Sequence, residues 1–334
     1  MITETDTPVS EEDVKLLGEV NDLYPVVNRE IRKRIIGQHA LVRDIFVALL
    51  AQGHCLMVGV PGLAKTLMVK TLANTLDLDF RRIQFTPDLM PGDILGSELI
   101  EEGADGRRNF RFVPGPIFGQ LILADEINRT PPKTQAALLE AMQEQRVTVA
   151  GQTHALRPPF FVLATQNPIE QEGTYPLPEA QLDRFMFCLK VGYPTRDEEV
   201  EILVRTTTSA EPTVKSVLTG EKIIALQNAV RAVPVPSSVA QFAVNLVHST
   251  RPEMATASER VKRYVRWGAG PRASQYLALA GKVLAAMGGR FNVAVEDIVE
   301  AAPMVLRHRV LLNYRAEADG ITADAIVADL LTKR

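Results

Sequence analysis

A glycine-bearing loop that ends in Lys-Thr constrains this chain more than any other segment. The loop is Gly59-Val60-Pro61-Gly62-Leu63-Ala64-Lys65-Thr66, between an apolar stretch at Cys55 to Val58 and a helical pattern from Lys65 to Leu76. Glycines let such a loop curl until its N–H groups converge on an anion, while the lysine reaches the outer phosphates and the threonine hydroxyl can ligate magnesium. A strand, this loop and a helix in that order predict a phosphate-binding α/β core.

One position departs from the usual phosphate-loop pattern. Ala64 stands where a glycine normally precedes the lysine. Alanine adopts a positive φ less readily than glycine, so we expect nucleotide binding to survive if this φ is negative. Ala64→Gly is expected to retain binding.

Composition limits the classes of protein that the chain can form. It has 334 residues, of which 46% are hydrophobic and 23% charged, which predicts two domains with cores of their own. A net charge of −3 and a pI of about 6.0 give no global attraction to nucleic acid or anionic membranes. Cys55 and Cys188 lie far apart in apolar stretches, which favours buried reduced thiols over a disulfide or a metal site.

The N-terminus lacks the features of an export signal, and no apolar run reaches the roughly 18 residues that span a bilayer. We therefore expect a cytoplasmic protein without membrane insertion.

Apolar strands alternate with helical patterns over much of the chain. Beyond Cys55 to Val58, strands are predicted at Arg82 to Phe85, Leu121 to Ala124, Phe160 to Thr165 and Met186 to Val191. This alternation predicts an α/β fold, a parallel sheet with helices on both faces. Before it, a capping box at Ser10-Glu11-Glu12-Asp13 predicts a first helix that Pro25 kinks or splits.

Two polar hairpins are predicted as insertions near 97–113 and 146–157, with turns at Gly103-Ala104-Asp105-Gly106 and Ala150-Gly151. From Pro194 onward helices dominate, which predicts a smaller helical domain. Its helices are expected near Glu221 to Val230, Ser238 to Ser249, Pro271 to Met287, Glu296 to Val305 and Ala323 to Leu331.

Polar side chains follow two of the predicted strands. Asp125 and Glu126 come directly after Leu121 to Ala124, and Asn167 follows Phe160 to Thr165 closely. Open parallel sheets bind ligands at the carboxyl ends of their strands. We expect Asp125 to hold magnesium, Glu126 to polarise a water, and Asn167 to contact that water and the γ-phosphate. The alternatives are an acidic helix start for Asp125 and Glu126 and a plain turn for Asn167.

Two arginines are further candidates. Arg184 precedes the last predicted strand, and Arg272 lies in the first turn of a helix in the second domain. A guanidinium that binds phosphate oxygens in pairs suits phosphoryl transfer. The alternative for each is a surface ion pair, for example Arg184 with Glu179 or Asp183.

Taken in order, these motifs closely resemble the MoxR family of AAA+ ATPases, in the helix-2-insert group that includes relatives of the magnesium chelatase ATPase subunit. The resemblance spans roughly Ile35 to the C-terminus. It rests on the Gly59 to Thr66 loop and on the segments Leu123-Ala124-Asp125-Glu126-Ile127-Asn128-Arg129, Ala164-Thr165-Gln166-Asn167-Pro168, Leu177-Pro178-Glu179-Ala180-Gln181-Leu182-Asp183-Arg184-Phe185 and Pro271-Arg272-Ala273.

The resemblance implies a role for each motif. Lys65 and Thr66 belong to Walker A, Asp125 and Glu126 to Walker B, Asn167 to sensor 1, Arg184 to the arginine finger and Arg272 to sensor 2. Alanine before the lysine is common in the family. The implied catalytic residues are Lys65, Glu126, Asn167, Arg184 and Arg272, with Thr66 and Asp125 on the metal. The implied ATP-binding residues are Ile36, Gly37, Gly59, Val60, Pro61, Gly62, Leu63, Ala64, Lys65, Thr66 and Leu67.

The resemblance also implies an architecture. We expect an AAA+ P-loop NTPase core with a five-stranded parallel sheet of order 5-1-4-3-2, two inserted hairpins that face the pore of a ring, and an all-α lid domain. The expected bounds are 1–34 for an N-terminal helical extension, 35–193 for the core and 194–334 for the lid.

The implied activity is hydrolysis of ATP with Mg²⁺ in a homo-hexameric ring. Arg184 is expected to project into the neighbouring subunit's site, whereas the resemblance leaves open whether Arg272 acts within its own subunit. Family members are thought to be chaperone-like, remodelling protein complexes or assisting metal-cofactor insertion with partners that carry von Willebrand A domains.

Two alternatives remain. Arg107-Arg108-Asn109-Phe110-Arg111-Phe112 and Arg260-Val261-Lys262-Arg263-Tyr264-Val265-Arg266-Trp267 interleave cations with aromatics, as in a nucleic-acid-directed motor. Solvated faces with aromatic anchors are the favoured interpretation of both, so no nucleic-acid partner is expected. The second alternative, a slow nucleotide-gated scaffold, is disfavoured by the presence of Glu126 and Arg184.

Overall fold

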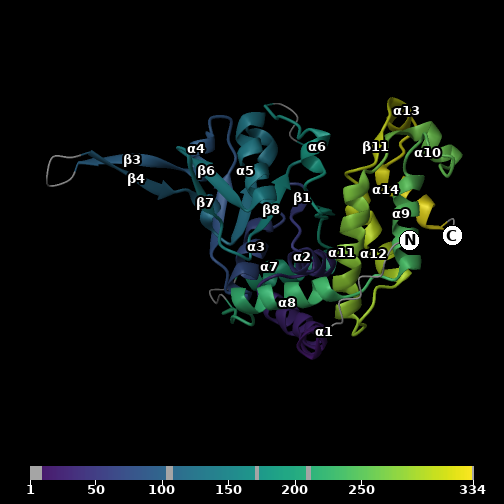
Figure 1. Ribbon diagram of the computed structural model, residues 1–334, viewed down its shortest axis with the longest axis horizontal. Coiled ribbons are helices and arrows are strands. Elements are labelled where there is room, and N and C mark those ends of the chain that lie inside the picture. The colour runs from purple at the N-terminus through teal and green to yellow at the C-terminus, as the bar shows by residue number, and fades with distance from the viewer. Residues whose placement is uncertain (1–9, 103–107, 170–172, 208–211, 333–334) are drawn as a thin grey trace.

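The central element of the computed structural model is a parallel sheet of five strands (Figure 1). The structure describes residues 10–102, 108–169, 173–207 and 212–332. The sheet has the order β2-β5-β8-β1-β9, which reads 5-1-4-3-2 when these five strands are numbered along the chain. The predicted α/β fold and strand order are therefore confirmed. The strands are β1 (Cys55–Val58), β2 (Phe80–Gln84), β5 (Leu121–Asp125), β8 (Phe161–Gln166) and β9 (Phe187–Lys190).

Two hydrophobic clusters cover opposite faces of the sheet, because successive side chains of a strand point to opposite sides. On β5, Leu121 and Leu123 join the cluster of α2 (His39–Leu50) and α3 (Lys65–Thr75). Ile122, between them, joins the cluster of α4 (Pro91–Leu95) and α5 (Pro132–Glu144). Helices on both faces explain why every residue of β5 is buried.

The edge strand β2 begins at Phe80, two residues before the predicted start at Arg82. Arg81 and Arg82 are exposed there. An edge strand with solvated residues lacks the continuous apolar run that marks the central strands, so its start is hard to recognise in the sequence.

Two β-hairpins extend from the core, as predicted. β3 (Gly96–Glu102) pairs with β4 (Arg108–Pro114) and projects well beyond the rest of the molecule (Figure 1), while β6 (Arg146–Val149) pairs with β7 (Gln152–Ala155). The rings of Phe112 and His154 stack with centroids 4.1 Å apart, which joins the base of the first hairpin to the second. The predicted turn at Gly103-Ala104-Asp105-Gly106 lies outside the described residues.

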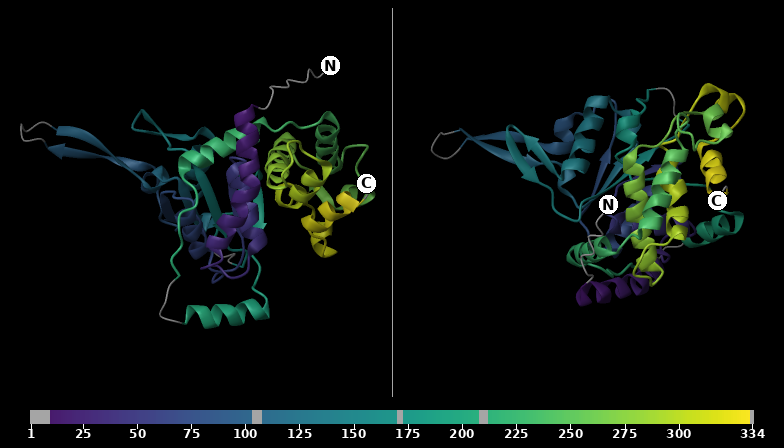
Figure 2. Two further views of the ribbon diagram at one scale, coloured as in Figure 1. Left: turned by 90° about the horizontal axis from the view of Figure 1, so that it is seen from below. Right: turned by 45° about the vertical axis from the view of Figure 1, so that its right-hand side comes forward.

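The first helix, α1 (Glu11–Ile31), opens with the predicted capping box, in which the N–H of Asp13 donates to Ser10 Oγ (3.1 Å). The helix runs through Pro25, so the predicted split is wrong. Buried Val20 and Val27 on either side of Pro25 hold the helix against the core. α8 (Gly220–Ala232) lies beside α1 (Figure 2), and Gln227 Nε2 on α8 donates to Leu49 O (2.8 Å).

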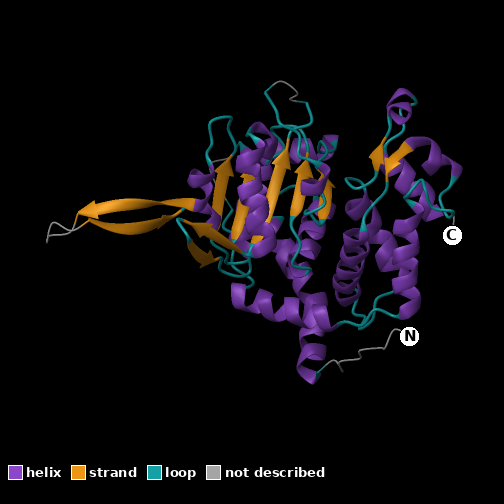
Figure 3. Ribbon diagram, turned by 45° about the horizontal axis from the view of Figure 1, so that its top comes forward, coloured by secondary structure: helices purple, strands orange, loops and turns teal. Residues whose placement is uncertain are grey.

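Most of the remaining C-terminal part is helical and lies beside the β9 edge of the sheet (Figure 3). Arg307 NH1 links it to the sheet by donating to Cys188 O on β9 (3.0 Å). Its helices are α9 (Ser237–Ser249), α10 (Glu259–Tyr264), α11 (Pro271–Met287), α12 (Val295–Leu306), α13 (Tyr314–Ala318) and α14 (Ala323–Thr332).

The expectation of an all-helical lid is wrong in one detail, because β10 (Val265–Trp267) pairs with β11 (Leu311–Leu312). Strands this short show no alternation that sequence patterns could reveal. The domain bounds 1–34, 35–193 and 194–334 stay a prediction. Among the residues that the structure describes, none of the helices has the length and apolarity to cross a membrane.

Candidate nucleotide-binding site

The loop between β1 and α3 packs closely against neighbouring strand ends. The N–H of Gly59 donates to Gln166 O at the end of β8 (3.2 Å). A Cβ on Gly59 would lie 2.7 Å from both the Cβ and the carbonyl oxygen of Val191, so this position requires glycine. Gly62 has a φ of +84°, in the region that glycine favours. These contacts fix a tight bend at the carboxyl edge of the sheet.

Ala64 has a φ of +54° at the N-terminal cap of α3. We expected nucleotide binding to survive if this φ is negative. The structure has a positive φ instead, so that condition is not met. A left-handed conformation costs a residue with a Cβ on the order of 1 kcal/mol, and such strain is typical of functional sites. The surrounding fold, rather than the preference of alanine, sets this part of the loop.

Because Ala64 is strained, we expect Ala64→Gly to raise the free energy of unfolding by about 0.5 to 1 kcal/mol and to retain nucleotide binding. Thermal unfolding and titration with a fluorescent ATP analogue measure the two effects. Ala73→Gly, within the same helix, is the matched control and should lower stability by about 1 kcal/mol or more. Total loss of binding in Ala64→Gly would contradict this interpretation of the loop.

Lys65, the first residue of α3, folds back over the loop, and its Nζ donates to Gly59 O (2.5 Å). Burial lowers the pKa of Lys65, and the negative charges of Asp125 and Glu126 oppose that shift. Lys65, Asp125 and Glu126 line one cavity, where their opposite charges attract each other.

Asp125 ends β5, and its carboxylate is held from two neighbouring strands. Oδ1 accepts a hydrogen bond from Thr165 Oγ1 on β8 (2.6 Å), and Oδ2 accepts one from Arg82 NH2 on β2 (2.7 Å). These two bonds fix the orientation of the carboxylate at the edge of the sheet.

Glu126 follows with a φ of +59°, a second strained position beside the loop. Its N–H donates to Thr165 Oγ1 (2.8 Å). Its Oε2 accepts hydrogen bonds from Gln84 Nε2 (3.1 Å) and Arg129 NH1 (3.0 Å). Thr165 therefore holds the Asp125 carboxylate and the Glu126 backbone, while Gln84 and Arg129 hold the Glu126 carboxylate.

One cavity of about 340 Å³ brings most of the predicted site together. Asn167 is 5% exposed, and its Oδ1 accepts from the N–H of Ile169 (3.1 Å), so it stabilises a turn as well as facing the cavity. The lining residues are Pro61, Gly62, Leu63, Ala64, Lys65, Thr66, Asp125, Glu126 and Asn167.

A second cavity of about 130 Å³ shares Gly62, Leu63 and Ala64 with the first. Its other lining includes the predicted residues Ile36 and Leu67, whose apolar side chains suit a planar base. The rest of its lining is Arg34, Ile35, Gln38, Pro194, Ile202 and Thr206.

Three residues of the predicted ATP-binding set line neither cavity: Gly37, Gly59 and Val60. Gly37 has a φ of +67°, and a Cβ there would lie 2.5 Å from Glu198 Oε1. Gly37 and Gly59 therefore shape the backbone around the cavities, while Val60 packs against the core.

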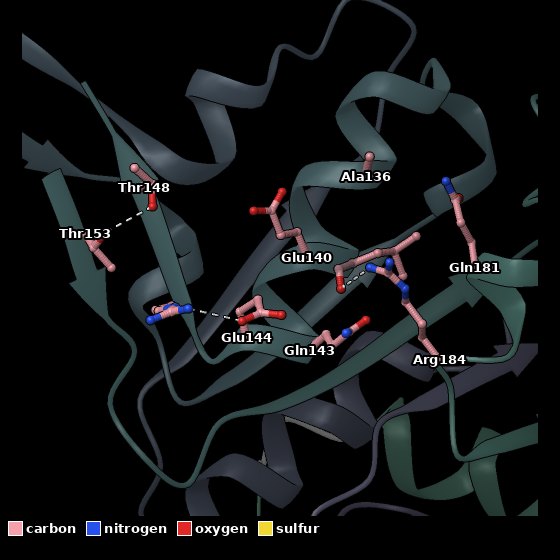
Figure 4. Close-up of a pocket in the computed structure, with 10 residues that line it drawn as sticks. Ala136, Glu140, Gln143, Glu144, Thr148, Thr153, Gln181 and Arg184 are labelled. Carbon is pink, nitrogen blue, oxygen red and sulfur yellow. Dashed lines mark hydrogen bonds and ion pairs between the residues drawn. The ribbon is translucent and has the colours of Figure 1, made fainter. Parts of the chain in front are cut away.

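Arg184 lies elsewhere, in a groove of about 600 Å³ between α5, the β6–β7 hairpin and α6 (Glu179–Leu182) (Figure 4). Its NH1 donates to Leu139 O (2.8 Å). In the described part of the chain Arg184 forms no ion pair, so the alternative of a surface pair with Glu179 or Asp183 is wrong. The cavity of about 340 Å³ is called the Lys65 cavity below, and it shares no lining residue with this groove.

Arg272 also lies outside the cavities. Its NH1 donates to Asp183 Oδ2 (2.9 Å), so the ion-pair alternative describes Arg272 in this conformation. Asp183 directly precedes Arg184 in the chain, so Arg272 is paired with the residue next to Arg184.

Sequence reasoning missed Thr165, Arg82, Gln84 and Arg129 around the two acids. The signal for Gln84 is its register with Asp125 on the adjacent strand. That register can be inferred only after the strand order is known, because the order places the end of β2 beside the end of β5.

Comparisons with known proteins identify the family of the chain. Residues 54–187 match the family model described as ATPase family associated with various cellular activities (AAA), and residues 257–330 match the AAA lid domain. Chaperone MoxR1 of Mycobacterium tuberculosis is 44% identical over 95% of this chain and 82% of its own length. Protein MoxR of Methylorubrum extorquens is 30% identical over 94% of this chain and 95% of its own.

The fold also has a close match among solved structures. A crystal structure from Cytophaga hutchinsonii ATCC 33406, provisionally described as an ATPase, superposes with a TM-score of 0.88 at 41% identity and covers 96% of each chain.

Proposed function

Since the chain belongs to the MoxR family of AAA+ ATPases, we propose that it hydrolyses ATP to ADP and phosphate in the cavity lined by Lys65. One observation carries the proposal. A single cavity gathers a loop lysine, two acids and an amide from the ends of three adjacent strands, β1, β5 and β8. These groups can bind phosphate and magnesium and position a water, which are tasks of phosphoryl transfer.

Thr66 and Asp125 are the proposed magnesium ligands. Both line the cavity, and hydroxyl and carboxylate oxygens are donors that Mg²⁺ accepts. The hydrogen bonds from Thr165 and Arg82 orient the Asp125 carboxylate, as outer partners of metal ligands do. Magnesium, when bound, neutralises charge that develops on the phosphate oxygens.

The other groups have separate proposed tasks. Lys65 exchanges its bond to Gly59 O for phosphate oxygens, since its ammonium already lies over the loop. Glu126 orients and polarises the attacking water, and Asn167 positions that water against the phosphate. Gln84 and Arg129 both hold Oε2 of Glu126, so the carboxylate can face a water with its other oxygen, Oε1.

We propose that Arg184 completes the site of a neighbouring subunit in a homo-hexameric ring. Its position in a groove separate from the Lys65 cavity supports action on a neighbour rather than on its own nucleotide. The absence of an ion pair within the described residues leaves its guanidinium available for phosphate. Head-to-tail contacts of this kind form a ring when the rotation between neighbouring subunits closes. Whether Arg272 contacts its own or a neighbour's nucleotide stays open.

We further propose that hydrolysis drives chaperone-like remodelling, maturation or metal-cofactor insertion of partner proteins, with von Willebrand A-domain proteins among them. The Mycobacterium tuberculosis relative is named as a chaperone, which supports the general class. The projecting β3–β4 hairpin offers a surface for such partners, because Leu99, Ile100 and Phe110 on it are exposed. A cytoplasmic location remains a prediction.

A substrate trap tests the partner class. Glu126→Gln protein, held with ATP and Mg²⁺, is expected to retain partner proteins that include a von Willebrand A domain. Lys65→Ala protein, treated identically, is the matched control and should retain none of them in a nucleotide-dependent way. Reproducible recovery of nucleic acid alone would overturn the proposal.

Several cations that suggested a nucleic-acid-directed motor are paired with carboxylates of the same protein. Arg111 pairs with Glu101 (3.0 Å), and Arg263 pairs with Asp319 (3.3 Å). Lys262 pairs with Glu259 (2.8 Å) in the same lid segment. Cations already matched by carboxylates are typical of solvated protein faces rather than of a phosphate-binding stripe. Arg107 lies outside the described residues.

A further inference from the structure

The backbone that carries Arg184 is held by the lid. Residues 183–186 connect α6 to β9, and the carbonyl groups of all four accept hydrogen bonds from Arg309 or Tyr276 of the lid. His308 Nε2 also lies 3.0 Å from the carbonyl oxygen of Phe185. Arg309 donates to the carbonyl oxygens of Asp183 (2.8 Å), Phe185 (2.7 Å) and Met186 (3.2 Å). The hydroxyl of Tyr276 donates to Arg184 O (3.1 Å). Arg184 therefore sits on a segment whose outer side is clamped by α11 and by the chain after α12.

The side chain of Arg309 is buried and paired at this contact. It is 5% exposed, and its Nε donates to Asp183 Oδ1 (2.7 Å). Its guanidinium also lies over the ring of Tyr276, 5.1 Å from the centroid. A buried guanidinium is costly unless its donors are satisfied, and here a carboxylate and several carbonyls satisfy them. Such a group tolerates little displacement of the backbone that it binds.

The same carboxylate reaches Arg272. Asp183 accepts from Arg309 at Oδ1 and from Arg272 at Oδ2. Two arginines of the lid thus converge on the residue that directly precedes Arg184. A movement of the lid relative to the sheet would change all of these bonds together.

We propose that Arg309 and Tyr276 are positioning residues for Arg184, so that the lid of one subunit controls the arginine that this subunit presents to its neighbour's nucleotide. The inference rests on the proposed role of Arg184 in the neighbouring site. In this arrangement, ATP hydrolysis depends on the lid of the subunit that donates Arg184 as well as on the lid of the subunit that binds ATP.

Mixed rings test this directly. Full-length Lys65→Ala protein donates Arg184 but binds no nucleotide, and Arg184→Ala protein binds ATP but donates no arginine. Arg309→Lys is added to one of these variants at a time, because lysine keeps a charge beside Asp183 but lacks the planar fork that bonds three carbonyls. Tyr276→Phe, which removes only a hydroxyl, is added in the same way in a second series.

In the arginine-donating variant, Arg309→Lys is expected to lower kcat of the mixture about 10- to 100-fold without changing KM for ATP, since small displacements of a catalytic group have effects of this size. Tyr276→Phe is expected to lower it about threefold in the same place. In the ATP-binding variant neither change should alter kcat by more than about twofold. Arg307→Lys is the control, because Arg307 joins the lid to Cys188 O and Asp324 without contacting residues 183–186.

Three outcomes would overturn the inference: the loss of kcat is equal in the two variants, it occurs only in the ATP-binding variant, or it occurs in neither. If Arg309→Lys protein does not fold, the Tyr276→Phe series decides by the same criteria. An inactive mixture without any lid substitution would instead refute the shared site, and the inference with it. Active mixtures that are indifferent to both lid substitutions would refute the inference alone.

Discussion

Arg184→Ala should reduce ATP hydrolysis by about 10³- to 10⁵-fold while leaving ATP affinity within a few-fold of the unsubstituted protein. The guanidinium lies in a groove that shares no residue with the Lys65 cavity, so its removal should not disturb the nucleotide that its own subunit binds. Its proposed role is to stabilise the transition state, in which charge accumulates on the transferred phosphoryl group. Steady-state phosphate release and titration with a fluorescent ATP analogue measure the two quantities.

Arg231→Ala is a matched control, because Arg231 is an exposed arginine on α8 whose NH1 donates to Gln52 Oε1. Its turnover should equal that of the unsubstituted protein. Normal turnover in Arg184→Ala protein would remove this arginine from the reaction.

The second large effect is expected from Glu126→Gln, which should lower kcat by about 10²- to 10⁴-fold and retain ATP binding. An amide of the same shape can still accept hydrogen bonds from Gln84 and Arg129, so the site should stay folded. A neutral amide polarises the attacking water less than a carboxylate does, and that polarisation is the role proposed for Glu126. Single-turnover hydrolysis, measured after saturation with ATP, separates this defect from weaker binding.

Glu221→Gln, in the first turn of α8, controls for the loss of a carboxylate as such. Its single-turnover rate should match the unsubstituted protein. If Glu126→Gln protein hydrolyses ATP at the normal rate, another group must activate the water.

The central part of the site could be predicted because parallel strands deliver their carboxyl ends to one edge of a sheet. Lys65, Asp125, Glu126 and Asn167 each follow a buried apolar strand, and a pattern of that kind is legible in a single sequence. The structure places all four around one cavity.

The residues that orient these groups could not be predicted in the same way. Thr165 lies inside an apolar strand, and its hydroxyl becomes informative only because β8 lies next to β5. Gln84 lies at the end of an edge strand with exposed arginines, where the apolar signal is weak. Both act through the register between strands, which local patterns do not specify.

Long-range contacts and backbone conformation could not be predicted from the sequence either. Arg309 and Asp183 are 126 residues apart in the chain, and no local pattern in the sequence pairs them. The left-handed conformation of Ala64 is imposed by packing around the loop against the preference of alanine. Tertiary structure decides such features.

Mixing Lys65→Ala with Arg184→Ala protein tests the shared active site most directly. Each variant alone should be nearly inactive, for a different reason. In randomly mixed rings, an intact Lys65 faces a neighbour's intact Arg184 at about a quarter of the interfaces when the ratio is one to one. ATP turnover should therefore rise with mixing, peak near that ratio and approach about a quarter of the unsubstituted rate. No recovery of turnover at any ratio, with subunit exchange verified, would contradict a site completed by the neighbour's arginine.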